Sequence, residues 1–434
     1  MGLNPTHVAI IGGGYAGLAA AVTLTEQTIP VTVFEAANHW GGRARRIVIN
    51  KLNLDNGQHI LLGAYHELRR LMALVGTAQD ALLTLPLTLS FPGNFTFKAR
   101  ALPSPWHLAM GLILAQGISN GMRLRLLAGL LRLAADRFYF AEDVNVETWM
   151  SKTSQPSVAC DLLWRPLCYA ALNTPPAQAS SKVFLNVLKK SFKQRHDSDL
   201  LLPQADLTAL FPEQAVAFLA LRTGVAHLSS PVKNVEAGTA GFTVSTDKER
   251  ASFSHVICAT APWHVPRLLV NLPELAHVTA QLEALTPQPI YTIYLQYPAS
   301  VTLPFPMVGM TGGLAQWVFD RGRLQGHAGL LAAVISAEGS HQTLSQGELA
   351  AQIQQELQSH LGNAKPLWHQ VIAEKRATFS CVPKLNRPRA VTPQKDFFLA
   401  GDYLNEDLPA TLESAVLSGV GAAQAVLRSV ELGR

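Results

Sequence analysis

The amino-acid sequence predicts an α/β fold in which a parallel sheet flanked by helices is assembled from separate segments, with an α+β domain inserted between them. Three observations predict it. Residues 7–35 follow the order strand, glycine-rich turn, helix and strand; residues 397–419 contain another strand followed by a helix; and the chain between them alternates between strand-like and helical patterns. At 434 residues the chain also exceeds what one hydrophobic core usually serves, so two domains are expected.

The first forty residues contain a complete dinucleotide-binding pattern. Residues 7–11 form a short apolar run rich in β-branched side chains, which predicts a buried strand. Residues 12–17 read G-G-G-Y-A-G, a match to G-x-G-x-x-G, and lead into helix-forming residues from Leu18. A second strand over residues 31–34 ends on Glu35. This succession predicts a Rossmann-like domain.

Each part of this pattern has a physical role. Gly12 permits the tight turn, Gly14 lets the backbone approach a pyrophosphate, and Gly17 lets the helix pack closely on the strand. The helix N-terminus offers unpaired N–H groups to the phosphates. Glu35 can accept hydrogen bonds from both ribose hydroxyls, which favours FAD or NAD over a 2′-phosphorylated cofactor. Ala16, which precedes Gly17, and Ala36, which follows Glu35, complete this part of the predicted cofactor site.

The loop after Glu35 reads W-G-G-R-A-R over residues 40–45. Two glycines, the second of them Gly42, let this loop pass close to the pyrophosphate, and Arg43 can offer its guanidinium fork to a phosphate. The pattern resembles the flavin-containing amine oxidase and carotenoid desaturase superfamily, in which it accompanies FAD. The alternative is a basic, solvated loop. FAD is therefore the predicted cofactor.

Two later segments are expected to return to the cofactor. Residues 55–63 place a polar cluster between a strand and an apolar run. As structure, the cluster is a turn signal. As a functional feature, it would position Gly57, Gln58 and His59 to meet the flavin. The backbone of Val232, within a strand region over residues 224–236, is expected to contact the adenine.

Near the C-terminus a strand over residues 397–400 ends in Gly401-Asp402, and a helix is expected about eight residues later with Pro409 in its first turn. Asp402 is placed to bond the ribitol of FAD. The helix N-terminus, with Ala410 and Thr411, would point at the flavin edge that becomes negative on reduction.

The domain boundaries follow from these positions. The FAD-binding domain is expected to comprise residues 1–85, 205–284 and 381–434, and the substrate domain residues 86–204 and 285–380. Within the second domain, residues 86–204 are predicted to be helical. Strands over residues 290–297, 329–336 and 371–378, with a helix over 345–361, predict a large, half-covered antiparallel sheet that forms one wall of an apolar pocket.

Composition limits the environment of the protein. Apolar residues make up 48% of the chain and charged residues 15%, yet no uninterrupted apolar run reaches the roughly 18 residues of a membrane span. A strand begins at residue 7, so no signal peptide is expected. The four cysteines form no C-x-x-C pair, which predicts buried or free thiols in a reducing cytoplasm and no metal site.

Basic and apolar residues gather between Asp80 and Asp136, a stretch without any acidic residue. Apolar runs cover residues 106–116 and 124–135. Such a stretch can lie on an anionic bilayer; the alternative is a helix pair that covers the substrate domain while its arginines reach to water. Nucleic-acid binding is not expected, because no basic cluster is interleaved with aromatic residues. The cations in this stretch are Lys98, Arg100, Arg123, Arg125 and Arg132.

A more particular resemblance rests on residues 54–65, 171–176, 198–203 and 408–413. Together they resemble the squalene-associated FAD-dependent desaturases, the hydroxysqualene dehydroxylases of bacterial hopanoid synthesis, over nearly the full length of the chain. The departures are small: Gly13 where alanine is usual, and Pro30 where a glycine often precedes the second strand.

The resemblance implies reductive removal of the hydroxyl of hydroxysqualene, a long apolar isoprenoid, giving squalene and water. It also implies neighbouring squalene-pathway enzymes as partners. The cysteines favour a cytoplasmic location, and the bilayer interpretation of the basic stretch would add peripheral contact to the inner face of the cell membrane. His59 is the candidate proton donor for the departing hydroxyl; the alternative is a ring that only bonds a backbone carbonyl or the flavin edge. Tyr169 and Asn173 are weaker pocket candidates, suited to packing and to a helix end.

Three other functions stay open on the sequence alone. An oxidative isoprenoid or carotenoid desaturase would share the fold, and residue types do not fix the direction of electron flow. An amine oxidase is disfavoured by the apolar helical insert. A non-enzymatic, membrane-docked partner of isoprenoid enzymes would use flavin as a structural ligand. No second nucleotide motif or iron–sulfur cysteine set identifies an electron donor.

Overall fold

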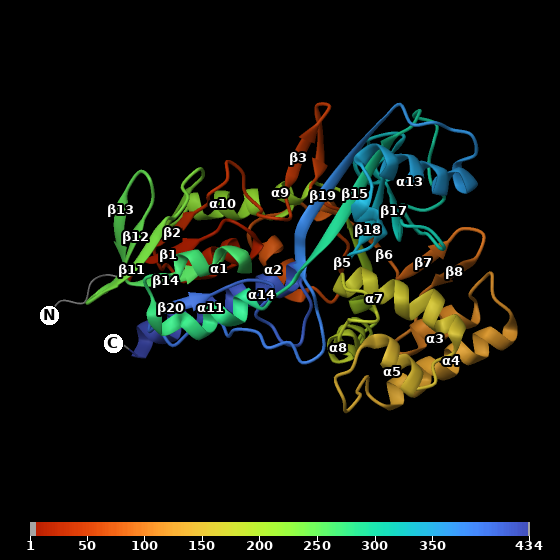
Figure 1. The fold of residues 1–434 in the computed structure, drawn as a ribbon, viewed down its shortest axis with the longest axis horizontal. Helices are drawn as coiled ribbons and strands as arrows, with labels where there is room; N and C mark the ends of the chain where they lie inside the picture. Colours follow the sequence, from red (N-terminus) through yellow and green to blue (C-terminus); the bar gives the residue numbers. More distant parts are fainter. Residues whose placement is uncertain (1–5, 433–434) are drawn as a thin grey trace.

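A computed structural model describes residues 6–432; the outermost residues of the predicted FAD-binding segments, 1–5 and 433–434, lie outside it. The molecule is elongated, with a parallel sheet at one end and an antiparallel sheet and a group of helices at the other (Figure 1). The long strands β15 (Pro287–Gln296) and β19 (Trp368–Phe379) extend from the middle of the molecule into the second part. The predicted α/β class is confirmed.

The parallel sheet has the strand order β10-β2-β1-β14-β20, and every neighbouring pair is parallel. Its strands come from widely separated parts of the chain, as the sequence predicts for a discontinuous domain. They are β1 (Val8–Ile11), β2 (Val31–Phe34), β10 (Gly224–His227), β14 (His255–Cys258) and β20 (Phe397–Leu399).

The two faces of this sheet are covered differently. In β1, Val8 and Ile10 belong to a core shared with helices, whereas Ala9 and Ile11 belong to a core shared with a three-stranded meander, because successive side chains of a strand point to opposite faces. The helices are α1 (Tyr15–Glu26), α10 (Pro212–Ala220) and α14 (Leu412–Leu432). The meander is β11 (Asn234–Gly238), β12 (Gly241–Ser245) and β13 (Arg250–Phe253), with α11 (Ala276–Glu283) beside it.

The start of α14 differs from the prediction. The helix begins at Leu412, so Pro409 lies in the preceding loop and not in the first helical turn. The reason is local: the hydroxyl of Thr411 accepts a hydrogen bond from the N–H of Ser414 (3.1 Å) and ends the loop two residues after the proline. Further along, α14 packs directly on α1, since a Cβ at Gly419 would lie 2.1 Å from the carbonyl oxygen of Ala16.

The antiparallel sheet has the order β16-β17-β18-β15-β19. The predicted half-covered sheet is wrong for its central strands, because β18 is buried along its whole length and β15 along most of it. One face packs on helix α13 through residues such as Ile293 and Ile353, and the other carries Tyr294 and Trp317 into the main core. The remaining elements are β16 (Met307–Gly309), β17 (Trp317–Asp320), β18 (Leu330–Ser336), α12 (Arg321–Gln325) and α13 (Gln346–Leu361).

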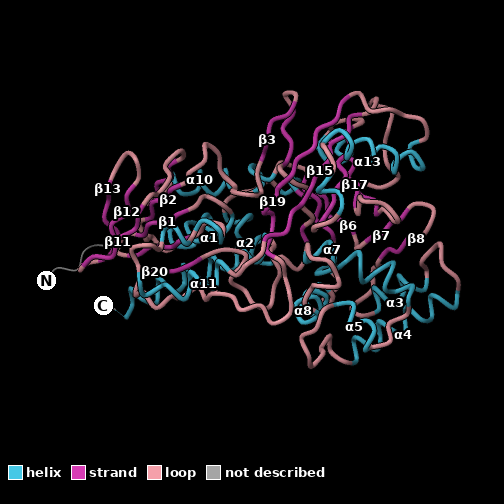
Figure 2. Tube along the Cα trace, viewed as in Figure 1, coloured by secondary structure: helices cyan, strands magenta, loops and turns pink. Residues whose placement is uncertain are grey.

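Residues 86–204 are mostly helical, as predicted, but they also contain strands that the prediction missed. The strands β7 (Thr88–Phe91) and β8 (Phe95–Lys98) form a hairpin, and β9 (Leu200–Pro203) joins β5 (Leu61–Leu62) and β6 (Leu82–Leu85) in a small sheet. Figure 2 shows the helices of this region gathered below the antiparallel sheet. They are α3 (Trp106–Ile113), α4 (Asn120–Ala135), α5 (Val146–Lys152), α6 (Ser157–Ala159), α7 (Arg165–Leu172) and α8 (Ser181–Ser191).

The remaining segments surround the junction of the two parts. The predicted strand pair is the hairpin β3 (Arg46–Ile49) and β4 (Leu52–Asp55), followed by α2 (His66–Leu74), and α9 (Leu207–Leu210) precedes α10. All four cysteines are buried and free, as expected. Within residues 6–432, no helix combines the length and apolar character needed to cross a bilayer.

Candidate functional site

One cleft collects most of the predicted site residues. It has a volume of about 700 Å³ and extends from the turn between β1 and α1 to the antiparallel sheet. Fifteen of the seventeen predicted cofactor residues line it, and Tyr169 and Asn173 line it too; Gly17 and Pro409 do not. The fifteen are Gly12, Gly14, Ala16, Glu35, Ala36, Gly42, Arg43, Gly57, Gln58, His59, Val232, Gly401, Asp402, Ala410 and Thr411.

The glycine-rich turn has the geometry that a phosphate cradle requires. Gly12 has φ = +114°, and a Cβ there would lie 2.7 Å from the carbonyl oxygen of Ala259, the residue that follows the neighbouring strand β14. A Cβ at Gly17 would lie only 2.0 Å from the carbonyl oxygen of Gly12, which explains its place behind the cleft. At Gly14 the nearest atoms would be 3.9 Å away, so the space in front of it is open. Gly14 is also the N-cap of α1 and makes no side-chain capping bond.

Glu35 is held at the end of β2 by two backbone donors. Its Oε2 accepts from the N–H of Gly13 (2.7 Å) and its Oε1 from the N–H of Ala37 (2.8 Å). A carboxylate has about four acceptor sites, so the side chain keeps capacity for ribose hydroxyls. The structure also explains the unusual Gly13: the Trp40 ring would lie 2.5 Å from a Cβ at this position, which leaves no room for alanine.

The Arg43 guanidinium does not point to the glycine-rich turn. Its Nη2 donates to both carboxylate oxygens of Asp402 (2.8 and 2.9 Å), and its Nη1 donates to the carbonyl oxygen of Ala377 (2.6 Å). These three hydrogen bonds therefore connect the loop after β2 to the Gly401-Asp402 turn and to β19. The predicted contacts of Arg43 with a phosphate and of Asp402 with the ribitol stay predictions.

A buried ion pair fixes the polar cluster after β4. The Nη2 of Arg321 lies 3.0 Å from Oδ2 of Asp55, and the two side chains are 3% and 2% exposed. Oδ1 of Asp55 accepts from the N–H of Leu207 (2.8 Å). Burial raises the pKa of Asp55, while the nearby Arg321 charge and its hydrogen bonds act to lower it.

Gln58 belongs to the same network. Its Nε2 donates to the hydroxyl of Tyr294 (2.7 Å), and its Oε1 accepts from Nη1 of Arg321 (2.5 Å). The Tyr294 hydroxyl in turn donates to the carbonyl oxygen of Asp55 (2.8 Å). The side-chain amide of Gln58 is thus bound to the protein, although the residue borders the cleft. The network positions the backbone of residues 57–59 against the cleft.

His59 is the only histidine of this loop, and its protonation follows from its surroundings. Its Nδ1 lies 3.1 Å from the carbonyl oxygen of Gly57, which can only accept, so Nδ1 carries the proton. Burial lowers the pKa of the ring, opposed by the Gly57 bond and by Asp55. The ring is therefore neutral at neutral pH, and Nε2 is the nitrogen that can take up a proton and return it.

Asn173 and Tyr169 lie at the end of α7. Asn173 has left-handed backbone angles (φ 45°, ψ 39°) and ends the helix, which agrees with the helix-end role considered for it. Its amide donates to the Thr378 hydroxyl (2.9 Å) and the Pro289 carbonyl (3.2 Å), and its Oδ1 accepts from the N–H of Ala337 (2.6 Å). It joins the helical region to β15, to β19 and to the residue that follows β18. Burial raises the pKa of Tyr169.

Sequence reasoning missed a polar row and an apolar wall of the cleft. Glu374, Arg376 and Thr378 line the cleft from alternate positions of β19, and Asn56 donates its amide to Glu374 (3.0 Å). Their period-two spacing within a predicted strand is a signal that could have identified this face. The apolar wall comes from three strands of one sheet, a grouping that no local pattern reveals. Its residues are Ile290, Trp317, Phe319 and Val334.

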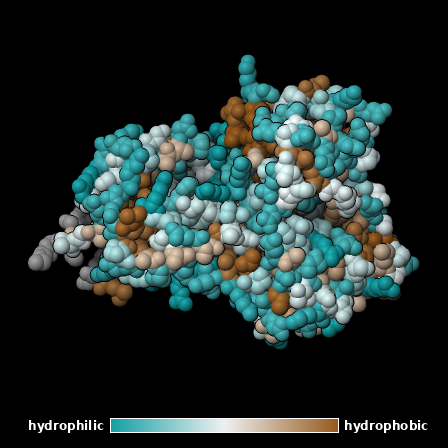
Figure 3. Space-filling view, in the orientation of Figure 1, coloured by the Kyte–Doolittle hydropathy of each residue, from teal (hydrophilic) through white to brown (hydrophobic). Residues whose placement is uncertain are grey.

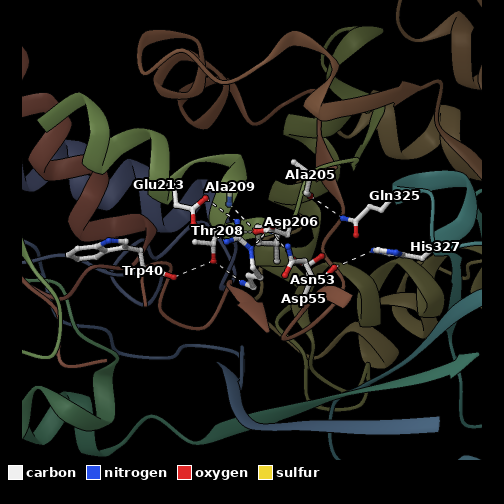
Figure 4. A network of polar contacts seen from close by, with 12 residues as sticks. Trp40, Asn53, Asp55, Ala205, Asp206, Thr208, Ala209, Glu213, Gln325 and His327 are labelled. Atoms are coloured by element: carbon white, nitrogen blue, oxygen red, sulfur yellow. Dashed lines mark hydrogen bonds and ion pairs between the residues drawn. The ribbon is translucent and has the colours of Figure 1, made fainter. Parts of the chain in front are cut away.

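A second polar network joins the start of β3 to α9 and α10 (Figure 4). Asp206 caps α9 by accepting from the N–H groups of Thr208 (3.1 Å) and Ala209 (3.0 Å). Arg46 binds both Asp206 (2.8 Å) and Glu213 (3.0 Å), and its backbone N–H donates to the Thr208 hydroxyl (2.7 Å). This network fastens the β3–β4 hairpin to α9 and α10, which carry the chain back into the parallel sheet.

These features define a dinucleotide-binding protein whose cleft runs from the glycine-rich turn to the antiparallel sheet. The open space at Gly14, the uncapped N-terminus of α1 and the acceptor Glu35 fit the phosphates and ribose of FAD, and the cleft continues to the Gly401-Asp402 turn and the antiparallel sheet. The model of the flavin containing amine oxidoreductase family matches residues 15–427, and the chain belongs to this family. It is an FAD-dependent oxidoreductase.

Individual relatives refine the comparison. The chain is 28% identical to a hydroxysqualene dehydroxylase of Zymomonas mobilis, over 98% of this chain and 99% of that protein. It is 23% identical to the 15-cis-phytoene desaturase of Glycine max, over 99% of this chain and 81% of that protein. Cyclohexylamine oxidase from Brevibacterium oxydans shares the fold, with a TM-score of 0.73 at 18% identity over 99% of this chain and 100% of that one.

Proposed function

We propose that this protein removes the hydroxyl group of hydroxysqualene reductively, giving squalene and water. The observation that carries the proposal is the composition of the cleft, which joins a dinucleotide-binding turn to an apolar wall of Trp317, Phe319 and Val334. A long apolar isoprenoid needs such a wall, whereas the cofactor needs the turn. The full-length similarity to a hydroxysqualene dehydroxylase supports the same substrate class.

The residues of the chain have separate tasks in this reaction. When bound and reduced, FAD would supply the hydride that replaces the hydroxyl, and the hydroxyl, once protonated, would leave as water. The glycine-rich turn and Glu35 hold the nucleotide end of the cofactor. The apolar wall excludes water from the carbon that accepts the hydride. A proton must reach the departing hydroxyl, and this proton has to come from a side chain in the cleft.

We propose His59 for this proton transfer. Its Nδ1 proton is held by the Gly57 carbonyl, so Nε2 is the exchangeable position. Because burial lowers the ring pKa, the protonated form is a minority at neutral pH and grows as the pH falls. Turnover that depends on this form should increase toward acidic pH. The increase should be absent in His59→Phe.

A second candidate is oxidative desaturation of an isoprenoid, favoured by the similarity to 15-cis-phytoene desaturase. The same wall would hold the hydrocarbon, and the electrons would run from substrate to flavin. We also propose a cytoplasmic protein that works beside other enzymes of the squalene pathway. The four buried, unpaired thiols support a reducing compartment.

The test uses the purified protein with its FAD reduced in the absence of oxygen. On addition of hydroxysqualene, we expect flavin re-oxidation and squalene formation in equal amounts. A flavin that stays reduced, with the oxidised protein desaturating an isoprenoid instead, would transfer the assignment to the second candidate. His59→Phe with FAD bound and an unchanged pH profile would eliminate the histidine while leaving the reaction intact.

A further inference from the structure

The two helices that follow the β7–β8 hairpin are apolar on the outside as well as on the inside. Of the 17 large hydrophobic residues that are exposed within residues 6–432, nine lie between positions 102 and 139. Figure 3 shows apolar surface beside the β7–β8 hairpin and α3, at the right-hand edge of the view. The nine are Leu102, Trp106, Met110, Ile113, Leu114, Met122, Leu124, Leu131 and Tyr139.

In α3 the exposed apolar residues share one face. Trp106, Met110 and Ile113 follow the i, i+4, i+7 spacing of a single helix face, and Trp106 is 62% exposed. The opposite face is already buried through Leu108 and Leu112. A helix on the surface of a water-soluble protein normally keeps its outer face polar. Because the inner face of α3 already packs on the core, the apolar residues of its outer face are not required for that packing.

In α4 the outer face alternates apolar and cationic side chains. Leu124 and Arg125 are exposed, and the same pair recurs seven residues later as Leu131 and Arg132, on nearly the same side of the helix. The inner face is buried through leucines such as Leu130. Leu124 is 67% exposed, so the arginine stems do not cover it from water.

The charge of this surface has one sign. No acidic residue occurs between Asp80 and Asp136. Within residues 6–432, none of the cations of this stretch forms an ion pair. Unpaired cations around exposed apolar side chains, with Trp106 and Tyr139 among them, match the headgroup region of an anionic bilayer, where aromatic rings and basic residues are both favoured.

The surface is joined to the cleft by packed aromatic side chains. Trp317 of the apolar wall contacts Phe91 (ring centroids 5.7 Å apart), and Phe91 contacts Phe95 (6.3 Å) in the β7–β8 hairpin. On the other side of this hairpin, Gly111 of α3 lies against the Phe97 ring and the backbone at Lys98. The outward helices thus rest on the same apolar body that forms the substrate side of the cleft.

We infer that the outer faces of α3 and α4 form a docking surface for an anionic lipid bilayer, with Trp106, Ile113 and Leu124 in the interface and Arg125 and Arg132 against the lipid phosphates. The long helices needed to span a bilayer are not required for this contact, because an amphipathic pair can lie in the interfacial plane. The inference concerns the surface alone and does not depend on the proposed reaction.

The test measures partition of the FAD-bound protein onto vesicles without any substrate. Vesicles of phosphatidylglycerol and phosphatidylcholine are compared with phosphatidylcholine alone, by co-sedimentation at low and high salt. We expect binding to the anionic vesicles that weakens with salt. Arg125→Glu with Arg132→Glu should reduce the partition at least about tenfold, while the control Lys248→Glu, an exposed cation on the β12–β13 turn, should not.

Apolar insertion is tested separately. Trp106→Ser with Ile113→Ser should lower the partition. The control pair Leu221→Ser with Val270→Ser, two apolar residues that are even more exposed (84% and 76%) elsewhere on the protein, should leave it unchanged. Circular dichroism and bound FAD confirm that each variant is folded. No binding to anionic vesicles at low salt would overturn the inference. So would a stable dimer in solution that the Trp106 and Ile113 substitutions dissociate, because a second copy of the chain would then cover the surface.

Discussion

Replacing Arg321 with methionine removes one partner of the most deeply buried ion pair described in the structure. The Arg321 and Asp55 side chains are 3% and 2% exposed, and their charged atoms are 3.0 Å apart. At an effective dielectric constant of about 20, Coulomb's law gives an attraction of about 5 kcal/mol at this separation. Breaking a buried pair on one side usually costs about 3–5 kcal/mol. We expect Arg321→Met to lower the free energy of unfolding by about this amount.

The pH dependence separates this explanation from a simple packing defect. Burial raises the pKa of Asp55, so its contribution to stability is present below its ordinary pKa and is lost as the pH rises through the raised value. Without Arg321 the pKa should rise further, because the attraction that lowers it is gone. The stability deficit of Arg321→Met should therefore shrink as the pH falls from neutral, when the Asp55 carboxyl takes up a proton.

Urea denaturation followed by circular dichroism, with FAD in excess, measures the deficit across this pH range. The double variant Asp55→Asn with Arg321→Met removes the buried charge and should recover a large part of the lost stability. A deficit that does not change with pH, together with a double variant as unstable as the sum of the single changes, would refute the argument.

Three further predictions, which use four substitutions, test the cofactor domain. Gly17→Val should prevent the β1–α1 unit from folding, because a Cβ there would lie 2.0 Å from the Gly12 carbonyl oxygen. Gly14→Ala should fold but bind FAD more weakly. Thermal melting and flavin absorbance distinguish the two outcomes. Glu35→Ala should raise the dissociation constant of FAD about 10- to 100-fold in a fluorescence titration, because the predicted charged hydrogen bonds to the ribose would be lost and the N–H groups of Gly13 and Ala37 would be left unpaired. Glu413→Leu should lower thermal stability by about 2 kcal/mol, because the buried carboxylate accepts two N–H groups at the start of α2 (3.0 and 2.9 Å).

The parts of the fold that sequence predicts well are those specified by neighbouring residues. The strand, turn and helix of residues 8–26 follow from backbone requirements at Gly12 and Gly17, which are met within a few residues of each other. The helix-end role predicted for Asn173 agrees with its left-handed backbone angles. In each case the signal and the structure it specifies lie in the same short segment.

The antiparallel sheet shows why other parts were mispredicted. The pattern over residues 290–297 predicted one strand of a half-covered antiparallel sheet. Tyr294 is completely buried all the same, since its hydroxyl donates to the Asp55 carbonyl and accepts from Gln58. These two hydrogen-bond partners, which satisfy the buried hydroxyl, lie more than 230 residues away in the chain. A periodic sequence pattern shows which side chains are polar, but it does not show the distant hydrogen-bond partners that allow a polar side chain to be buried.

The same limit applies to the two halves of the cleft. The cofactor half depends on backbone geometry around phosphates, so glycines and a single acid at fixed spacing are enough to predict it. The apolar half consists of side chains from β15, β17 and β18, which become neighbours only when the sheet has formed. Asp55 illustrates the boundary: the sequence marks it as a turn residue, but its position beside Arg321, 266 residues away, makes it the anchor of the loop that carries His59. The cofactor could therefore be predicted from motifs alone, whereas the identity of the substrate depends on the packing of distant strands and has to be tested on the folded protein.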